Sequence, residues 1–342
     1  MGCRVWHALA FATTGAAALV VCGSALAHSE PRMPGHPVCR GSPAAQPALA
    51  RLHEALAQAR FVTYQPTSLT VMNGRVAPSN ASSIRADLGV LRQRFDGLIT
   101  YDAIHGNEAL PALAAALKFR ALIIGVWDPL DETQLAAAIA AARRFPELVT
   151  GLSLGNELLF SRRMTAAGLV AAIARLRQRL PATPLSTTEP FHLFYDAAQS
   201  ELLGQLDFLL VNVHPVFQPW FHQADDATAA QFVVNVLAEL AARSCGPILV
   251  KETGMPTAPA EAGFSAARQA SFYRELRQRL PPTSLHAFAY FAAFDAPWRA
   301  FDALAAPGAK PGVHPEEAHW GLYDGARRPK LAARELPALP ER

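Results

Sequence analysis

Two glutamates that each follow an apolar, strand-like run are the residues best suited to chemistry in this sequence. Glu157 ends the run GLSLGNE (151–157), and Glu252 follows the run ILVK (248–251). Two carboxyl groups on one cleft can cleave a glycosidic bond, because one is protonated and assists the leaving oxygen while the other is ionised. Like charges held close together force the two proton affinities apart, and this assigns the roles. The alternative for either glutamate alone is a structural role, as a helix cap or an ion-pair partner.

The elements that must position these glutamates are short apolar runs that alternate with helical runs from Phe61 onward. Several runs are almost entirely apolar, as in ALIIGVW and DFLLVNV, which is typical of parallel strands buried on both faces. The segments between them are amphipathic, with apolar residues at helical spacing, as at Leu169, Ile173 and Leu176. The expected strands are 61–64, 97–101, 121–126, 149–154, 185–188, 208–213, 248–252 and 287–291.

Eight strands with intervening helices predict an α/β fold, a (β/α)8 TIM barrel in a single domain, with a doubly wound sheet as the alternative. Active sites in such barrels form at the carboxyl ends of the strands. Strands four and seven lie across the barrel mouth from one another. We therefore expect Glu157 and Glu252 to face one small volume.

The amino-terminal 27 residues are expected to be a cleaved secretory signal. Arg4 supplies a positive charge, residues 8–21 are apolar, and Ala25-Leu26-Ala27 fits a cleavage site. The apolar stretch is shorter than the roughly 20 residues needed to cross a bilayer. A lipoprotein anchored through Cys22 is the alternative. We expect the protein to be secreted, periplasmic or held at the cell envelope.

The rest of the chain is divided by composition. Five prolines without periodicity predict an extended leader over residues 28–47, followed by the catalytic domain over 48–330 and a C-terminal tail over 331–342. Cys39 and Cys245 remain after the signal and can pair in an exported chain, although the sequence leaves their pairing open.

Composition excludes several classes of protein. The 342 residues are 51% hydrophobic, which excludes disorder, and the formal net charge is only +3. So small a charge does not indicate a nucleic acid or a membrane surface as partner. The sequence has no cysteine or histidine spacing typical of a metal site and no glycine-rich phosphate loop. We expect no metal, no cofactor and no stable protein partner.

Three motifs carry a family resemblance: GLSLGNE (151–157), ILVKETGMP (248–256) and YFAAFDAPW (290–298) with HWGLYDGARRPK (319–330). Together they resemble glycoside hydrolase family 17, particularly its bacterial members that act on β-1,3-glucan. The resemblance extends from FVTYQPT (61–67) to Lys330.

The resemblance implies a retaining double displacement on β-1,3-glucan, with an endo-glucanase-like action. It implies Glu157 as the general acid/base, Glu252 as the nucleophile and Asn156 as a hydrogen-bond partner of the sugar 2-hydroxyl. Transglycosylation through the same glycosyl-enzyme intermediate is the alternative, since the two reactions differ only in whether water or a sugar hydroxyl reaches it first.

Aromatic residues in the expected loops are candidates for binding the saccharide, because aromatic faces can pack against the C–H faces of sugars. The alternative for each one alone is that it fills the core. The tryptophans are Trp127, Trp220, Trp298 and Trp320. The other candidate binding residues are Tyr64, Tyr101 and His214 at strand ends, and Phe291 and Asp295 in the last motif.

This sequence departs from the family pattern at three positions. The family often has arginine where this chain has Ile99, glutamate where it has Ala292, and tyrosine where it has Val216. None of the three replaces a carboxylate of the expected pair. They bear instead on substrate-binding geometry and on the ratio of hydrolysis to transfer.

Three other functions are less well supported by the residues. Residues 151–155 match the G-x-S-x-G motif of esterases, but that motif needs a helix directly at the serine. His53-Glu54 begins like a zinc protease motif, yet Ala57 stands where the second histidine is needed. A non-catalytic glucan-binding envelope protein is expected to lack one of the two carboxylates, and both are present.

Overall fold

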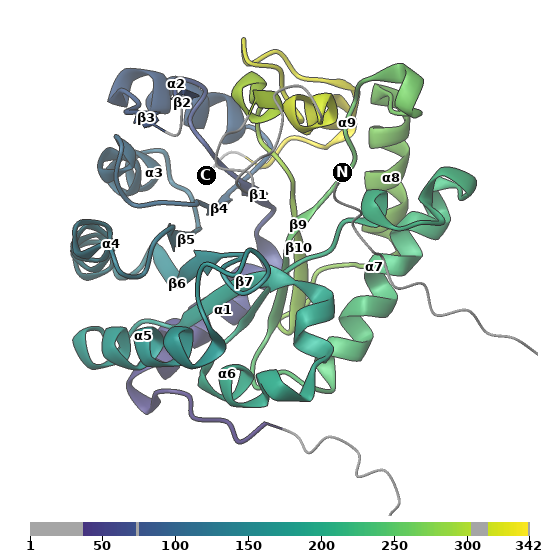
Figure 1. Cartoon of the computed structure of the whole chain (residues 1–342). Coiled ribbons are helices and arrows are strands. Elements are labelled where there is room, and N and C mark those ends of the chain that lie inside the picture. The colour runs from purple at the N-terminus through teal and green to yellow at the C-terminus, as the bar shows by residue number, and fades with distance from the viewer. Residues whose placement is uncertain (1–36, 73–74, 302–313, 341–342) are drawn as a thin grey trace, which may run out of the picture. The chain divides into compact units, whose positions relative to one another are not determined.

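A closed barrel of eight parallel strands forms the centre of the computed structural model, which describes residues 37–72, 75–301 and 314–340 (Figure 1). The strands follow the order β1-β10-β9-β8-β7-β6-β5-β4 around the barrel. Closure confirms the expected (β/α)8 barrel and excludes the doubly wound sheet. The barrel strands are β1 (Phe61–Thr63), β4 (Gly97–Ile99), β5 (Ala121–Val126), β6 (Val149–Asn156), β7 (Leu185–Pro190), β8 (Leu209–Asn212), β9 (Ile248–Thr253) and β10 (His286–Tyr290).

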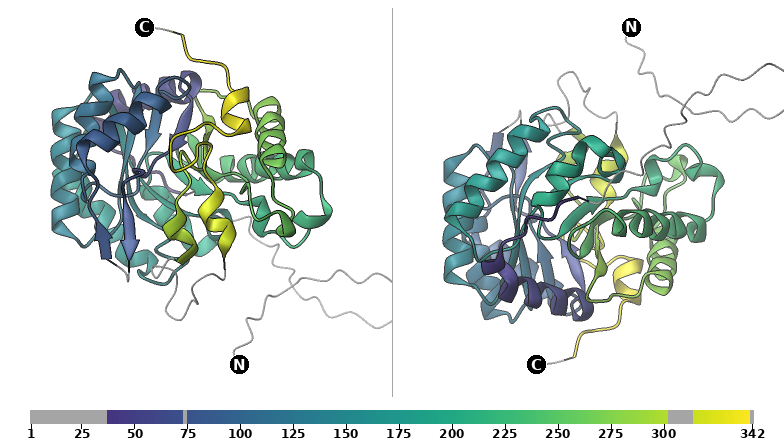
Figure 2. Two further views of the ribbon diagram at one scale, coloured as in Figure 1. Left: turned by 90° about the horizontal axis from the view of Figure 1, so that it is seen from above. Right: turned by 90° about the horizontal axis from the view of Figure 1, so that it is seen from below.

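Helices surround the strands, as the two views of Figure 2 show. Several long helices are preceded by an N-cap residue whose side chain accepts a hydrogen bond from a backbone N–H of the first turn. Examples are Thr165 before α5, Asp225 before α7 and Ser265 before α8. The helices that follow the strands are α2 (Ala81–Leu91), α3 (Leu110–Ala116), α4 (Glu132–Arg144), α5 (Ala166–Arg179), α6 (Ser200–Gln205), α7 (Asp226–Ala241), α8 (Ala266–Arg279) and α9 (Leu331–Glu335).

The amino-terminal end of the barrel is filled by α1 (Gln46–Gln58), which precedes the first strand. Leu52 and Leu56 of this helix are buried in one cluster with Phe61, Ile99 and Leu249, which come from strands around the barrel. The barrel is therefore closed by apolar packing at this end, and polar side chains gather at the carboxyl ends of the strands.

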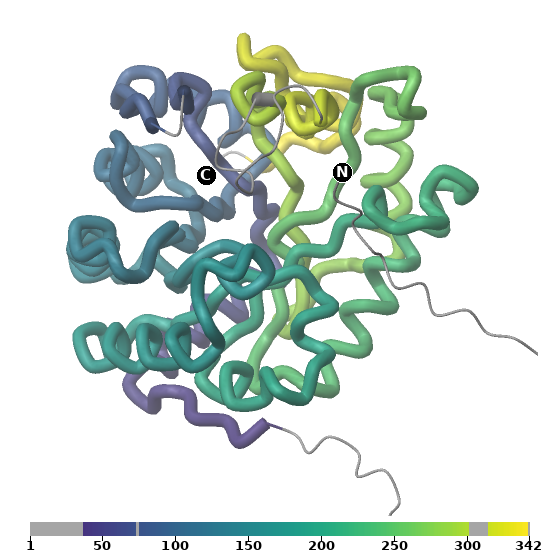
Figure 3. The backbone as a smooth tube through the Cα atoms, viewed as in Figure 1, coloured from purple at the N-terminus to yellow at the C-terminus, as the bar shows by residue number. Residues whose placement is uncertain are grey.

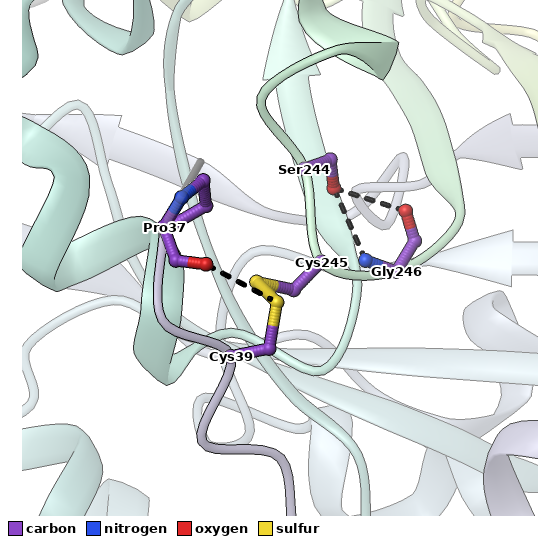
Figure 4. Close-up of a disulfide and its surroundings, with 5 residues drawn as sticks. All are labelled: Pro37, Cys39, Ser244, Cys245 and Gly246. Carbon is purple, nitrogen blue, oxygen red and sulfur yellow. Dashed lines mark hydrogen bonds between the residues drawn. A yellow bond between two sulfur atoms is a disulfide. The ribbon is translucent and has the colours of Figure 1, made fainter. Parts of the chain in front are cut away.

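The segment before α1 contacts the same end of the molecule, close to α6. Figure 3 draws this segment in purple at the bottom of the view. Arg40 N–H donates to the carbonyl of Gly204, and Ser42 N–H donates to Asp207 Oδ1. Cys39 and Cys245 form a disulfide (Figure 4), so the pairing that the sequence left open is present.

The extended leader expected over residues 28–47 is wrong at its end. A 3-10 helix, η1, spans Pro43–Ala45, and α1 already begins at Gln46. Pro43 and Pro47 fit there because proline in a first helical turn lacks only an N–H that has no intrahelical partner. Two other expected segments, residues 28–36 and the secretory signal over 1–27, lie outside the described residues.

The expected tail over residues 331–342 also needs correction. It contains α9, which packs against α8 and buries Ala332, Ala333 and Leu336. Five residues are too few for a helical period to be visible in the sequence. A second unexpected element is the antiparallel pair β2 (Thr70–Met72) and β3 (Arg75–Ala77), which stands beside the barrel mouth. Among the described residues, no helix has the length and apolar composition to cross a membrane.

Candidate active site

A cleft of about 250 Å³ lies at the carboxyl ends of the barrel strands. It brings together nine of the residues expected at the site. Further lining residues include Asp102, Phe217, Arg299 and Glu317. The nine expected residues are Tyr101, Trp127, Asn156, Glu157, His214, Glu252, Phe291, Trp298 and Trp320.

Glu157 reaches the cleft because β6 ends irregularly. Ser153 pairs with Ser186 of β7 and Asn156 with Thr188, so β6 carries one extra residue between these pairs. Gly155 has a φ of +78°, and a Cβ there would lie 2.1 Å from Leu158 Cδ1, which requires glycine. Such bulges redirect side chains next to active sites.

A second bulge, in β9, directs Glu252 into the cleft. Val250 pairs with Val211 of β8, whereas Glu252 pairs with the next residue, Asn212, so Lys251 is the extra residue. The register against β10 shifts in the same stretch. Side chains alternate along a regular strand. The bulge breaks this alternation, and the consecutive Lys251 and Glu252 both reach the site.

The surroundings of Glu157 favour its protonated form. Its Oε1 accepts a hydrogen bond of 2.9 Å from Asn212 Nδ2. Burial raises the pKa of Glu157, and the nearby charge of Glu252 raises it further, while the Asn212 hydrogen bond and the charges of His214 and Lys251 oppose the rise. The outcome is a raised pKa, as a proton donor needs.

The surroundings of Glu252 favour its ionised form. Burial alone raises the pKa of this carboxyl, but Lys251 and His214 outweigh burial and bring the pKa to about 2. His214 Nε2 lies 3.5 Å from Oε2, and Lys251 Nζ lies 3.5 Å from Oε1. The cleft therefore holds one carboxyl poised to donate a proton and one carboxylate poised to attack.

Three expected binding residues do not line this cleft. The Tyr64 hydroxyl is buried and donates to Asp87 Oδ2 at 2.8 Å. Trp220 packs against Phe232 of α7, with ring centroids 5.3 Å apart. Asp295 lies in an adjoining pocket of about 290 Å³ and accepts a hydrogen bond of 2.6 Å from Lys330 Nζ. Packing against neighbouring elements, which strand-end position does not reveal, decides these placements.

Polar residues that sequence reasoning missed complete the site. Asn212 and Lys251 form hydrogen bonds with Glu157 and Asn156, respectively. Each is a polar residue that interrupts an apolar run, and this feature of the sequence could have identified it. Glu189, at the end of β7, is fully buried and accepts hydrogen bonds from the backbone N–H groups of Leu159 and Phe160, at 2.8 and 3.1 Å. It therefore holds the loop that follows Glu157.

The alternatives raised by the sequence find no support in this geometry. Ser153, the serine of the G-x-S-x-G match, is buried inside β6 and lies 3.1 Å from the Thr188 hydroxyl. The strand continues to Asn156, and the next α-helix, α5, begins only at Ala166. His53 lies on α1 with Nδ1 2.6 Å from the Ser284 carbonyl oxygen. Within the described ranges, no cluster of three or more histidine, cysteine, aspartate or glutamate side chains can hold a metal ion.

The barrel holds two carboxyl groups in one cleft, one with a raised pKa and one with a lowered pKa. This is the arrangement of a glycoside hydrolase. The chain is an O-glycosyl hydrolase. Residues 62–321 match the family described as the BtgE/BtgC glycoside hydrolase domain. The chain belongs to this family. The resemblance to glycoside hydrolase family 17 is confirmed.

Two fungal proteins are similar to this chain in sequence. A glucan 1,3-beta-glucosidase of Arthroderma benhamiae is 26% identical over 72% of this chain and 82% of its own length. A probable beta-glucosidase btgE of Aspergillus terreus is 24% identical over 52% of this chain and 30% of its own length.

Solved structures share the fold. A family 17 beta-1,3-glucanosyltransferase from Rhizomucor miehei aligns with a TM-score of 0.61 at 20% identity, covering 80% of this chain and 95% of its own. An endo-laminarinase from Formosa aligns with a TM-score of 0.61 at 15% identity, covering 80% of this chain and 85% of its own.

Proposed function

We propose that this protein cleaves β-1,3-glucan with retention of configuration, using Glu157 as general acid/base and Glu252 as nucleophile. The observation that carries the proposal is the contrast between the two carboxyls, since burial raises the pKa of Glu157 while Lys251 and His214 hold that of Glu252 at about 2. The names of the similar Arthroderma and Rhizomucor proteins support the choice of β-1,3-glucan.

The chemistry follows from these charges. The Glu252 carboxylate attacks the anomeric carbon, and Glu157 gives its proton to the bridging oxygen as that bond breaks. A glycosyl ester on Glu252 forms and the shortened glucan leaves. Glu157, now ionised, takes a proton from a water whose oxygen attacks the same carbon and releases Glu252. Two inversions at one carbon give net retention.

Aromatic faces along the cleft suit a saccharide. Trp127 and Trp298 line it and are partly exposed, and the guanidinium carbon of Arg163 lies 4.7 Å from the Trp127 ring centroid, which holds this ring in place. Trp320 also borders the cleft, but it is only 2% exposed and packs against Phe291, so it fills the core. Asn156 lies beside Glu157 on the cleft wall, where an amide can meet the 2-hydroxyl of the sugar that reacts.

Product analysis tests this function and separates it from transfer. Laminarihexaose, a β-1,3-linked glucose hexamer, is incubated with the protein, and the first products are followed by proton NMR and by mass spectrometry. We expect shorter chains whose new reducing ends appear first as the β-anomer. A first-formed α-anomer would contradict retention. Products longer than six sugars would assign transfer in place of hydrolysis, and the absence of any product would overturn the proposal.

We also propose that the protein acts outside the reducing cytoplasm. The disulfide between Cys39 and Cys245 supports this, because such bonds persist in oxidising compartments, as does the expected signal over residues 1–27. Amino-terminal sequencing of the exported protein tests it. We expect a mature chain that begins at His28, and a retained Met1 would contradict export by cleavage.

A further inference from the structure

Lys251 is a buried cation at the centre of the site, on the strand that carries Glu252. Its side chain is only 2% exposed. Burying an ammonium group is costly unless charges and hydrogen-bond acceptors compensate for the lost water. A buried lysine therefore has to be explained by its partners.

The partners of Lys251 are all cleft residues. Its Nζ donates a hydrogen bond of 2.6 Å to Asn156 Oδ1 and lies 3.5 Å from Glu252 Oε1. The same atom lies 4.3 Å from the centroid of the Tyr101 ring, within the range of a cation–π contact. The hydrogen bond to Asn156 uses one N–H donor of the ammonium group, while the Glu252 carboxylate and the Tyr101 ring compensate for its buried charge.

The backbone of β9 explains how Lys251 comes to point into the barrel mouth. Lys251 is the extra residue of the bulge between Val250 and Glu252. Without the bulge, the side chains of the consecutive residues Lys251 and Glu252 would point to opposite faces of the strand. The bulge thus places a cation and a carboxylate from adjacent residues in one site.

The cations near Glu252 come from two elements. Lys251 lies next to it on β9, with Nζ 3.5 Å from Oε1, and the charge of Arg299 also lowers the pKa of Glu252. The His214 ring lies 3.5 Å from Oε2. Of these side chains, only Lys251 is adjacent to Glu252 in the sequence.

We propose that Lys251 is a positioning residue that fixes the Glu252 carboxylate and the Asn156 amide and balances the negative charge of the site. This role rests on the proposed function of Glu157 and Glu252. Lys251 acts through these groups and needs no contact with the substrate.

Loss of the charge has a defined consequence. Lys251 lowers the pKa of both Glu252 and Glu157. A neutral side chain at position 251 therefore raises both values, and both limbs of the pH profile of kcat/KM move to higher pH. An opposite charge at this range shifts a pKa by about one to three pH units. The other charged or titratable groups that face Glu252 are Glu157, His214, Tyr101, Arg299 and Glu317.

The test compares Lys251→Gln with Lys251→Arg. Gln keeps a donor for Asn156 and removes the charge, and Arg keeps the charge. The pH profile of kcat/KM is measured on laminarihexaose. We expect Gln to move the acid limb, set by Glu252, upward by about one to three pH units, and the alkaline limb, set by Glu157, upward by less, because Lys251 is the smallest of the effects on Glu157. We expect Arg to leave both limbs near their wild-type positions. Lys330→Gln is the matched control, because Lys330 pairs with Asp295 outside the cleft, and its limbs are expected to stay in place.

Unmoved limbs in a folded Lys251→Gln protein would overturn the proposal. If this variant does not fold, the melting temperature of Glu252→Gln decides, since this change leaves the Lys251 ammonium without its carboxylate. We expect Glu252→Gln to melt below wild type at pH 7, and an equal or higher melting temperature would overturn the pairing. Turnover that survives in Glu252→Gln would refute the proposed function itself, so the two failures are distinguishable.

Discussion

Asn212 Nδ2 donates a hydrogen bond of 2.9 Å to Oε1 of Glu157, so a side chain at the end of β8 fixes a carboxyl group that follows β6. The two strands are not neighbours, because β7 lies between them in the barrel. The bond therefore bridges the end of β7 and joins residues that lie 55 positions apart in the sequence.

Replacing Asn212 tests this link. The Asn212 hydrogen bond lowers the pKa of Glu157, so Asn212→Ala should raise that pKa and move the alkaline limb of kcat/KM to higher pH. Loss of the hydrogen bond that orients the protonated carboxyl should also lower kcat/KM by about two- to tenfold. The measurement is the pH profile on laminarihexaose. Asn235→Ala, on the exposed face of α7, is the control, and an Asn212→Ala profile identical to wild type would contradict the link.

Glu189 should make stability depend on pH. Burial raises its pKa to about 7, despite the two backbone N–H groups that lower it, whereas an unfolded glutamate titrates near the ordinary value of 4.5. Below pH 4.5 both states are protonated and the full stability is present. As the pH rises toward 7 only the unfolded state releases this proton, so the free energy of unfolding falls, and above 7 the loss levels off.

The matching measurement is the melting temperature of wild type and Glu189→Gln between pH 4.5 and 8. We expect the decline in wild type to be clearly weaker in the variant, because a glutamine does not titrate. Glu54→Gln, at an exposed position on α1, controls for general charge effects. Equal slopes for wild type and Glu189→Gln would show that the buried carboxyl is ionised throughout.

Much of the fold could be predicted because the barrel strands are apolar on both faces. Runs such as 121–126 admit few other structures, and all eight expected strands are found with each end within two residues of the expected bound. Glu157 and Glu252 could be predicted as site residues because they follow such runs directly. The number of expected strands and their alternation with expected helices then indicated a closed barrel.

The rest of the site depends on features that periodicity does not contain. The bulges of β6 and β9 shift side chains by one residue, so the inward direction of Lys251 could not be read from alternation. Trp220 turned toward Phe232 because α7 offers an apolar face beside it. Asp295 turned toward Lys330, which lies 35 residues further along the chain. Each of these outcomes is set by tertiary contacts.

The disulfide should contribute stability without affecting catalysis. It joins residues 206 positions apart, so it restricts the unfolded chain strongly, and Cys39→Ser with Cys245→Ser should lower the free energy of unfolding by roughly 2–5 kcal/mol. Cys245 lies before the start of β9, at the opposite end from the cleft, so kcat at 25 °C should not change. Urea unfolding measures the loss. Reductant should destabilise wild type equally and leave the double variant unchanged, and equal unfolding curves without reductant would contradict a stabilising role.

The assignment of roles to the two carboxyls is tested most directly by azide rescue of Glu157→Gly and Glu252→Gly, with an aryl β-laminaribioside as substrate. Without azide, loss of Glu157 should lower turnover of laminarihexaose by about 10²–10⁴-fold, and loss of Glu252 should abolish it. With azide, the Glu252 variant should release the α-glycosyl azide, because azide attacks the substrate directly. The Glu157 variant should release the β-glycosyl azide, because azide attacks the glycosyl-enzyme intermediate. The same anomer from both variants, or full turnover by Glu252→Gly, would contradict the account.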